Sequence, residues 1–149
     1  MPSPRILKTH LPVQLLPDQV WTKKPKIIYV SRDVKDVAVS NYHFWYSFDV
    51  KRKIDLNEYF DNFLNDKVFY GPYRESVQNY FNIPNYENII FITYEDMCAD
   101  LDATISKVSE FLGKSIAHEN RQKLKEHLSF ENMKSKSQSL NNFYEKTKF

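Results

Sequence analysis

The segment spanning residues 26–40 joins a short apolar run to a helical pattern and constrains the fold more than any other. Its residues 27–30 read Ile-Ile-Tyr-Val, a composition typical of a buried strand. Arg32 stands where the run stops, and a helical pattern that includes Ser40 begins at once. Ligands bind at the carboxyl ends of strands in α/β sheets, and both a guanidinium and a helix N-terminus suit a phosphate. The segment therefore predicts an anionic ligand and favours a nucleotide.

The composition and charge limit the classes of protein to which this chain can belong. The 149 residues are 42% hydrophobic and 15% aromatic, which indicates one folded domain, and the net charge of +2 gives no case for nucleic-acid binding. Cys98 is the one cysteine, so no intrachain disulfide can form. Residues 1–8 lack a signal-peptide pattern, and the apolar runs are too short to span a membrane. We expect a soluble cytoplasmic protein without a membrane partner.

The glycine content excludes one kind of phosphate site. Gly71 and Gly113 are the two glycines of the chain, so a Gly-rich phosphate loop cannot be present within it. Any phosphate site must then use side chains and helix termini.

Strand-like and helical patterns alternate along the chain. We expect strands at 5–10, 26–31 and 88–93, the last two buried on both faces, and helices at 33–46, 56–64, 72–81, 101–112 and 117–128. Asp55 and Asp100 suit helix N-caps, and Gly113 suits a helix end. The alternation predicts an α/β fold with a short parallel sheet flanked by helices. We assign residues 1–133 to a partial domain and 134–149 to a polar, loosely ordered tail.

Several segments resemble the cytosolic sulfotransferases in sequence, order and spacing. They read Lys8-Thr-His-Leu-Pro12, Arg32 through Phe44, Tyr94-Glu-Asp-Met97 and Phe111-Leu-Gly-Lys-Ser115, with a less strict match at 127–133. The resemblance covers about residues 3–133. It implies a partial sulfotransferase fold like that of nucleotide kinases. It also implies transfer of the sulfuryl group of 3'-phosphoadenosine 5'-phosphosulfate (PAPS) to a hydroxyl or amine of a small acceptor.

The same resemblance implies roles for six residues. His10 is the expected general base, since a neutral imidazole can take the acceptor's proton, and Lys8 stabilises the transferring group. Arg32 and Ser40 are expected to hold the 3'-phosphate of the cofactor. Tyr94 and Phe130 are expected at its adenine. Without the resemblance, His10 reads as structural, Tyr94 as a core tyrosine, and Arg32 as the ion-pair partner of Asp33 or Asp36.

The resemblance also implies that two aromatic-rich regions lie near the acceptor pocket, where they would suit a flat apolar acceptor such as a phenol or steroid-like molecule, although core packing explains most of these residues equally well. They occupy residues 42–48 and flank Gly71. No metal is implied. The acceptor's identity and the oligomeric state stay open.

Two parts of the family pattern do not occur in this sequence. They are the Lys-Ser-Gly-Thr-Thr phosphosulfate loop and the late Arg-Lys-Gly segment. We therefore expect a fragment that is poorly stable and weakly active, because groups that hold the transferring sulfuryl are missing. A non-catalytic nucleotide-binding or interaction module is the alternative. A nucleotide kinase is disfavoured by the lack of a Walker-type loop and by the presence of Lys8 and His10.

Overall fold

The computed structural model describes residues 5–48, 54–84 and 87–136. The chain divides into two compact units, Met1–Glu95 and Asp96–Phe149, which are treated in turn. In the described part, no helix is both long enough and apolar enough to cross a bilayer.

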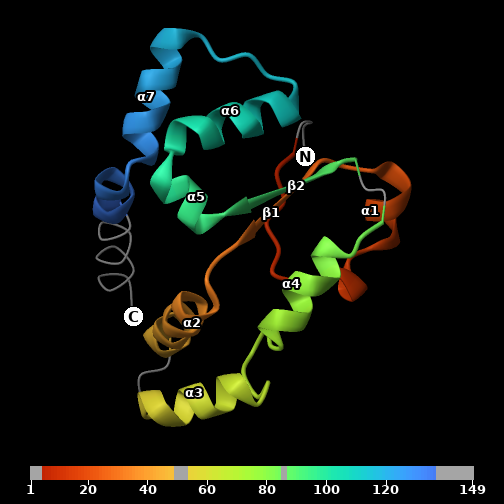
Figure 1. The fold of residues 1–149 in the computed structure, drawn as a ribbon, viewed down its shortest axis with the longest axis vertical. Helices are drawn as coiled ribbons and strands as arrows, with labels where there is room; N and C mark the ends of the chain where they lie inside the picture. The colour runs from red at the N-terminus through yellow and green to blue at the C-terminus, as the bar shows by residue number, and fades with distance from the viewer. Residues whose placement is uncertain (1–4, 49–53, 85–86, 137–149) are drawn as a thin grey trace, which may run out of the picture. The chain divides into compact units, whose positions relative to one another are not determined.

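The first unit contains a parallel pair of strands, β1 (Ile27–Ser31) and β2 (Ile89–Thr93) (Figure 1). Their register pairs the first residues, Ile27 and Ile89, and the last residues, Ser31 and Thr93. Helices occupy the long connection between the strands: α2 (Val34–Phe48), α3 (Leu56–Leu64) and α4 (Tyr73–Phe81). This arrangement confirms the predicted α/β class with a short parallel sheet flanked by helices.

Proline residues divide the segment that precedes β1. The 3-10 helix η1 (Val13–Leu15) follows Pro12, and α1 (Asp18–Lys23) follows Pro17, which occupies its N-cap position. The segment before β1 therefore contains two short helical elements.

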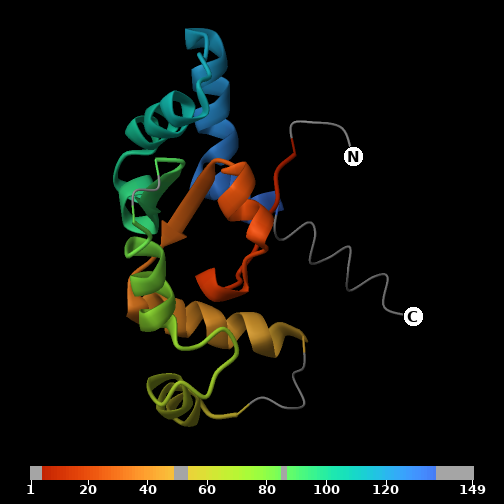
Figure 2. The ribbon, with the colours of Figure 1, turned by 90° about the vertical axis from the view of Figure 1, so that its right-hand side faces the viewer.

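Aromatic contacts hold α4 against one face of the sheet. The ring of Tyr80 stacks on Tyr29 of β1 with centroids 4.2 Å apart, and the ring of Phe81 stacks on Phe91 of β2 at 4.3 Å. Figures 1 and 2 both show α4 beside the strands. Because Tyr29 and Phe91 are partners in the sheet register, the helix covers both strands at the same level.

The expectation that β1 is buried on both faces is wrong. Its exposure alternates, with Ile28 39% and Val30 51% exposed. A strand is buried on both faces only where other elements pack on both. In the described residues the sheet has two strands, so β1 is also an edge strand.

The expected strand at 5–10 is also wrong. Residues 5–12 have no regular secondary structure, and Ile6 is 98% exposed. A strand forms only where a neighbour accepts and donates its backbone hydrogen bonds, which an apolar pattern alone cannot guarantee. Lys8 and His10 therefore do not share a strand face.

Aromatic side chains also join α2 to α3. Tyr59 of α3 lies 5.2 Å from Tyr42 and 6.2 Å from Tyr46, centroid to centroid. The Tyr42 hydroxyl donates to the carbonyl of Ile54 at 3.1 Å. The predicted cap is confirmed, since the Asp55 carboxylate accepts from the Asn57 amide at 2.9 Å.

The second unit is helical. Its helices are α6 (Leu101–Leu112), α7 (His118–Leu128) and a further helical segment at 130–136, while α5 (Tyr94–Ala99) leads into it from the first unit. The predicted ends of α6 are confirmed: Asp100 accepts from the Ala103 amide at 2.8 Å, and Gly113 adopts φ 66°. The predicted loose tail lies outside the described residues from 137 onward.

One arginine ties α6 to α7. Arg121 Nε lies 2.8 Å from Asp102 Oδ1, and Arg121 Nη2 lies 2.8 Å from Asp102 Oδ2. This two-point hydrogen bond from Arg121, and then its charge with that of Lys125, hold the pKa of Asp102 below its ordinary value of 3.8.

Tyr59→Phe is expected to raise the free energy of unfolding by about 1 kcal/mol. Its hydroxyl is buried and finds no hydrogen-bond partner within the described part of the chain, and a buried unsatisfied group is destabilising. Burial also raises the pKa of Tyr59 to about 12. Urea unfolding measures the change. Tyr42→Phe is the matched control and should lose about 1 kcal/mol, because its hydroxyl is bonded. Equal effects of the two changes would contradict the prediction.

Asp102→Asn is expected to destabilise the chain at neutral pH but not in acid. A carboxyl whose folded pKa is depressed stabilises the fold above its unfolded pKa, and that stabilisation is lost as pH falls through the folded pKa. The difference in unfolding free energy between wild type and variant should therefore shrink below about pH 4. Urea unfolding at several pH values measures it. Glu110→Gln, a change on the same helix, is the control and should show no such convergence.

Candidate functional site

The carboxyl ends of β1 and β2 bring two predicted site residues together. Ser31 and Thr93 are paired in the register, so Arg32 and Tyr94, which follow them directly, meet at the same edge. The Arg32 guanidinium carbon lies 4.2 Å from the centroid of the Tyr94 ring. A guanidinium stacked on an aromatic face keeps its planar edge of N–H donors available for an anion.

Arg32 also forms an ion pair with Asp36, which the sequence analysis gave as the alternative to a role in phosphate binding. Its Nε and Nη2 donate to Asp36 Oδ2 at 3.2 and 2.9 Å. Both side chains are partly exposed, so the pair is weak and easily exchanged for another anion. Ser40 is one turn beyond Asp36 on α2, and i,i+4 spacing puts the two on the same helix face. Asp36 and Ser40 therefore share one face of α2, and Arg32, which precedes the helix, contacts that face through Asp36.

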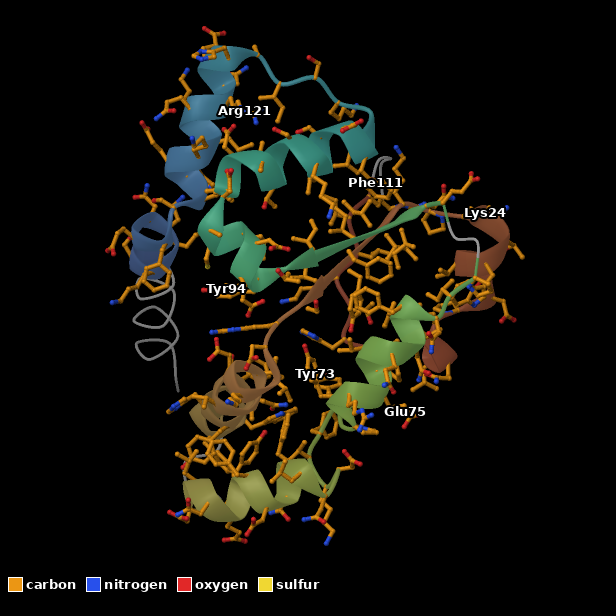
Figure 3. The ribbon with its side chains drawn as sticks, in the orientation of Figure 1. Lys24, Tyr73, Glu75, Tyr94, Phe111 and Arg121 are labelled. Atoms are coloured by element: carbon orange, nitrogen blue, oxygen red, sulfur yellow. The ribbon has the colours of Figure 1, made fainter. Side chains whose placement is uncertain are left out.

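The turn between β1 and α2 is fixed by side chains from two other elements. The Asp33 carboxylate accepts from the Lys35 amide at 2.9 Å, while the Asp33 amide donates to Glu95 Oε1 at 3.0 Å. The Tyr73 hydroxyl accepts from the Arg32 amide at 3.1 Å and donates to the Arg32 carbonyl at 2.6 Å. Figure 3 shows Tyr73 at the start of α4, directed toward this turn. These bonds fix the backbone from which the guanidinium extends.

His10 lines a cavity of about 310 Å³ in the first unit. Its ring lies 5.4 Å from that of Tyr70, centroid to centroid. Gly71, Pro72 and Glu75, at the start of α4, line the same cavity. The imidazole is exposed, so it is accessible to a small molecule in the cavity.

Aromatic rings gather beside this cavity. Phe69 lies 4.8 Å from Trp45 and 4.9 Å from Tyr70, and both Phe69 and Tyr70 are exposed. Exposed aromatic rings provide a surface for a flat apolar molecule, whereas Tyr42 of the same predicted group is buried in packing.

Two further predicted site residues, Lys8 and Phe130, take part in none of the contacts described above. Lys8 is exposed in the irregular segment before η1. Phe130 belongs to the second unit, where the residue is 66% exposed and the Lys134 ammonium lies 5.9 Å from the centroid of its ring.

Tyr73 and Glu95 bond to the turn that carries Arg32, a role that the sequence assigned to neither, although Tyr73 belongs to the aromatic group around Gly71. Glu95 carries a detectable signal, because it follows Tyr94 after a strand end and so must lie near the same edge. Tyr73 carries none, since its partner Arg32 is 41 residues away in the sequence.

A larger hollow of about 570 Å³ adjoins the His10 cavity and shares Gln14 and Asn79 with it. Trp21 and Lys24 contribute to its lining, and none of the predicted site residues does.

Comparison with known proteins places these residues in a family. A family model described as a sulfotransferase domain matches residues 1–148. Sulfotransferase 1C2 of Rattus norvegicus is 44% identical over 135 residues, which cover 90% of this chain and 46% of that protein. Sulfotransferase 1A1 of Canis lupus familiaris is 36% identical over 137 residues, covering 91% of this chain and 46% of that protein. The chain spans about half the length of the curated relatives it matches.

Solved structures agree with the sequence comparisons. Mouse sulfotransferase SULT7A1, solved in complex with PAP, matches with a TM-score of 0.85 and 32% identity over 91% of this chain and 49% of that one. Retinol dehydratase, solved with androsterone and the inactive cofactor PAP, matches with a TM-score of 0.75 and 31% identity over 89% of this chain and 39% of that one. The resemblance noted in the sequence is thus confirmed, and the chain belongs to the sulfotransferase domain family.

Proposed function

We propose that this protein is a sulfotransferase that uses PAPS to sulfate a hydroxyl or amine of a small acceptor. One observation carries the proposal: the Arg32 guanidinium, stacked on Tyr94, lies at the carboxyl edge of a parallel sheet beside the N-terminus of α2. That edge is where α/β folds bind nucleotides. The related SULT7A1 structure contains PAP, the nucleotide that remains when PAPS has given up its sulfuryl group.

In this proposal Arg32 and Ser40 bind the 3'-phosphate, and Tyr94 and Phe130 contact the adenine. Arg32 has five N–H donors, of which Nε–H and one Nη2–H go to Asp36. The other three N–H donors can bind a phosphate. If the phosphate displaces Asp36, the two donors that bond to Asp36 become available to it as well. Ser40, on the same face of α2, adds a hydroxyl donor.

His10 acts as the general base. As the acceptor oxygen attacks sulfur, its proton passes to the imidazole, and the bond between sulfur and the phosphate oxygen breaks to release PAP. Lys8 stabilises the negative charge of the transferring group. Since this sequence has no Lys-Ser-Gly-Thr-Thr stretch, slow turnover remains a prediction.

The acceptor is an apolar or aromatic molecule. The exposed rings of Phe69 and Tyr70 beside His10 support this class. Structures of the related retinol dehydratase contain androsterone or retinol, both of which carry a hydroxyl on an apolar body.

Arg32→Ala is expected to weaken PAP binding by about tenfold or more, because hydrogen bonds to a charged group are strong. Asp36→Asn is expected to strengthen it about twofold, because the competing carboxylate of a weak exposed pair is removed. Isothermal titration calorimetry with PAP measures both. Arg74→Ala, which removes an exposed arginine of α4, is the matched control and should bind as wild type does. Unchanged binding by Arg32→Ala would remove the phosphate-site assignment.

His10→Ala is expected to lower kcat for sulfation of a simple phenol by about 100-fold or more, with PAP affinity unchanged. His118→Ala, at an exposed histidine of α7, is the control and should retain wild-type kcat. Product formation from PAPS measures the rates. If the wild type binds PAP but forms no product, the protein is instead a nucleotide-binding module without catalysis.

A further inference from the structure

Helix α4 contacts both segments that carry the proposed site residues, and it does so through two tyrosine hydroxyls. Tyr73, its first residue, bonds to Arg32. Tyr80, near its end, donates to the carbonyl of Leu11 at 2.9 Å. Leu11 directly follows His10, so each hydroxyl holds backbone within one residue of a proposed functional group.

The Tyr80 contact is a long-range hydrogen bond to the end of an irregular segment. Residues 5–10 are exposed and belong to no helix or strand. At Leu11 the amide donates to Thr9 Oγ1 at 3.0 Å, and the carbonyl accepts from Tyr80. The first bond is local, whereas the second joins residues 69 apart in sequence. Tyr80 thus fixes the end of the segment to the body of the first unit.

Tyr80 is itself held firmly. Its side chain is buried, and its ring stacks on Tyr29 of β1 with centroids 4.2 Å apart. Burial raises the pKa of Tyr80 above its ordinary value of 10.0, so the hydroxyl, which any tyrosine keeps protonated at neutral pH, stays a donor in alkaline solution as well. The carbonyl of Leu11 is therefore attached, through the hydroxyl and the ring of Tyr80, to β1, the strand that directly precedes Arg32.

Tyr73 fixes the other segment with a single hydroxyl that both accepts and donates. The amide and the carbonyl of Arg32 bond to it at 3.1 and 2.6 Å. Because both the amide and the carbonyl of Arg32 are held, the peptide groups before and after Arg32 cannot rotate freely. Rotation there would change the direction in which the guanidinium extends.

The spacing of the two tyrosines connects these contacts. Seven residues make about two turns of an α-helix and a rise of about 10 Å, so Tyr73 and Tyr80 lie on the same face. We propose that Tyr73 and Tyr80 are positioning residues, through which α4 sets the placement of His10 relative to Arg32. The inference rests on the proposed function, since it assumes that acceptor and nucleotide bind at those two residues.

Tyr→Phe variants test the proposal, because they remove each hydroxyl and keep each ring. Nuclear magnetic resonance of the labelled full chain reports both segments without needing activity. Tyr80→Phe should abolish the nuclear Overhauser contact between the rings of His10 and Tyr70, which lie 5.4 Å apart, and should leave exchange of the Arg32 amide unchanged. Tyr73→Phe should speed exchange of the Arg32 amide about tenfold and leave the ring contact in place.

Binding and turnover then show the functional consequence. Tyr73→Phe should weaken PAP binding about threefold to tenfold, whereas Tyr80→Phe should leave PAP binding within twofold of wild type and lower kcat. Asp55→Ala is the matched control, because loss of the α3 cap removes a similar amount of stability without touching α4. It should change none of these readouts.

The outcomes separate this inference from the proposed function. If the His10–Tyr70 contact is absent in wild type, or persists in Tyr80→Phe, the positioning role of Tyr80 is overturned. Unchanged Arg32 exchange in Tyr73→Phe overturns the role of Tyr73. Failure of the wild type to bind PAP overturns the proposed function, while the two resonance measurements still decide whether α4 holds both segments.

Discussion

The parallel pairing of β1 and β2 is the constraint on which the site depends. In this register the last residues of the two strands are paired. Arg32 and Tyr94, which follow them, are therefore neighbours although 62 positions separate them in sequence. The cation–π contact between Arg32 and Tyr94 is a consequence of that register. A shift by one residue would send these two side chains to opposite faces of the sheet.

Helix α4, in the connection between the two strands, contributes further contacts to the site. Aromatic stacking places α4 on the face of the sheet that carries Tyr29 and Phe91. From there the first turn of α4 reaches the turn after β1, and its last turn reaches Leu11. The same helix start also lines the cavity at His10. A single short helix thus contacts the nucleotide side and the acceptor side of the proposed reaction centre.

Sequence predicted the local features well and the long-range ones poorly. The caps at Asp55 and Asp100 and the helix end at Gly113 were predictable because each depends on a few adjacent residues. The strand at 5–10 was predicted wrongly because a strand requires a partner that the segment itself does not specify. Burial of β1 was overestimated for a similar reason: an apolar run does not reveal what packs on each face. The edge position of Arg32 could be read from the strand-to-helix pattern, but the hydroxyls of Tyr73 and Tyr80 could not, since their partners lie 41 and 69 residues away.

The turn after β1 has a consequence for how a ligand approaches it. Within residues 32–36 the cations Arg32 and Lys35 are matched by Asp33 and Asp36, and Glu95 brings a third carboxylate to the same backbone. These five groups, two cations and three carboxylates, together offer no net positive charge to a doubly charged phosphate. Recognition at such a place depends on short-range geometry, and long-range electrostatic attraction contributes little to the rate of encounter. The association rate is then expected to vary only slightly with ionic strength, unlike that of proteins that draw anions into a strongly basic cleft.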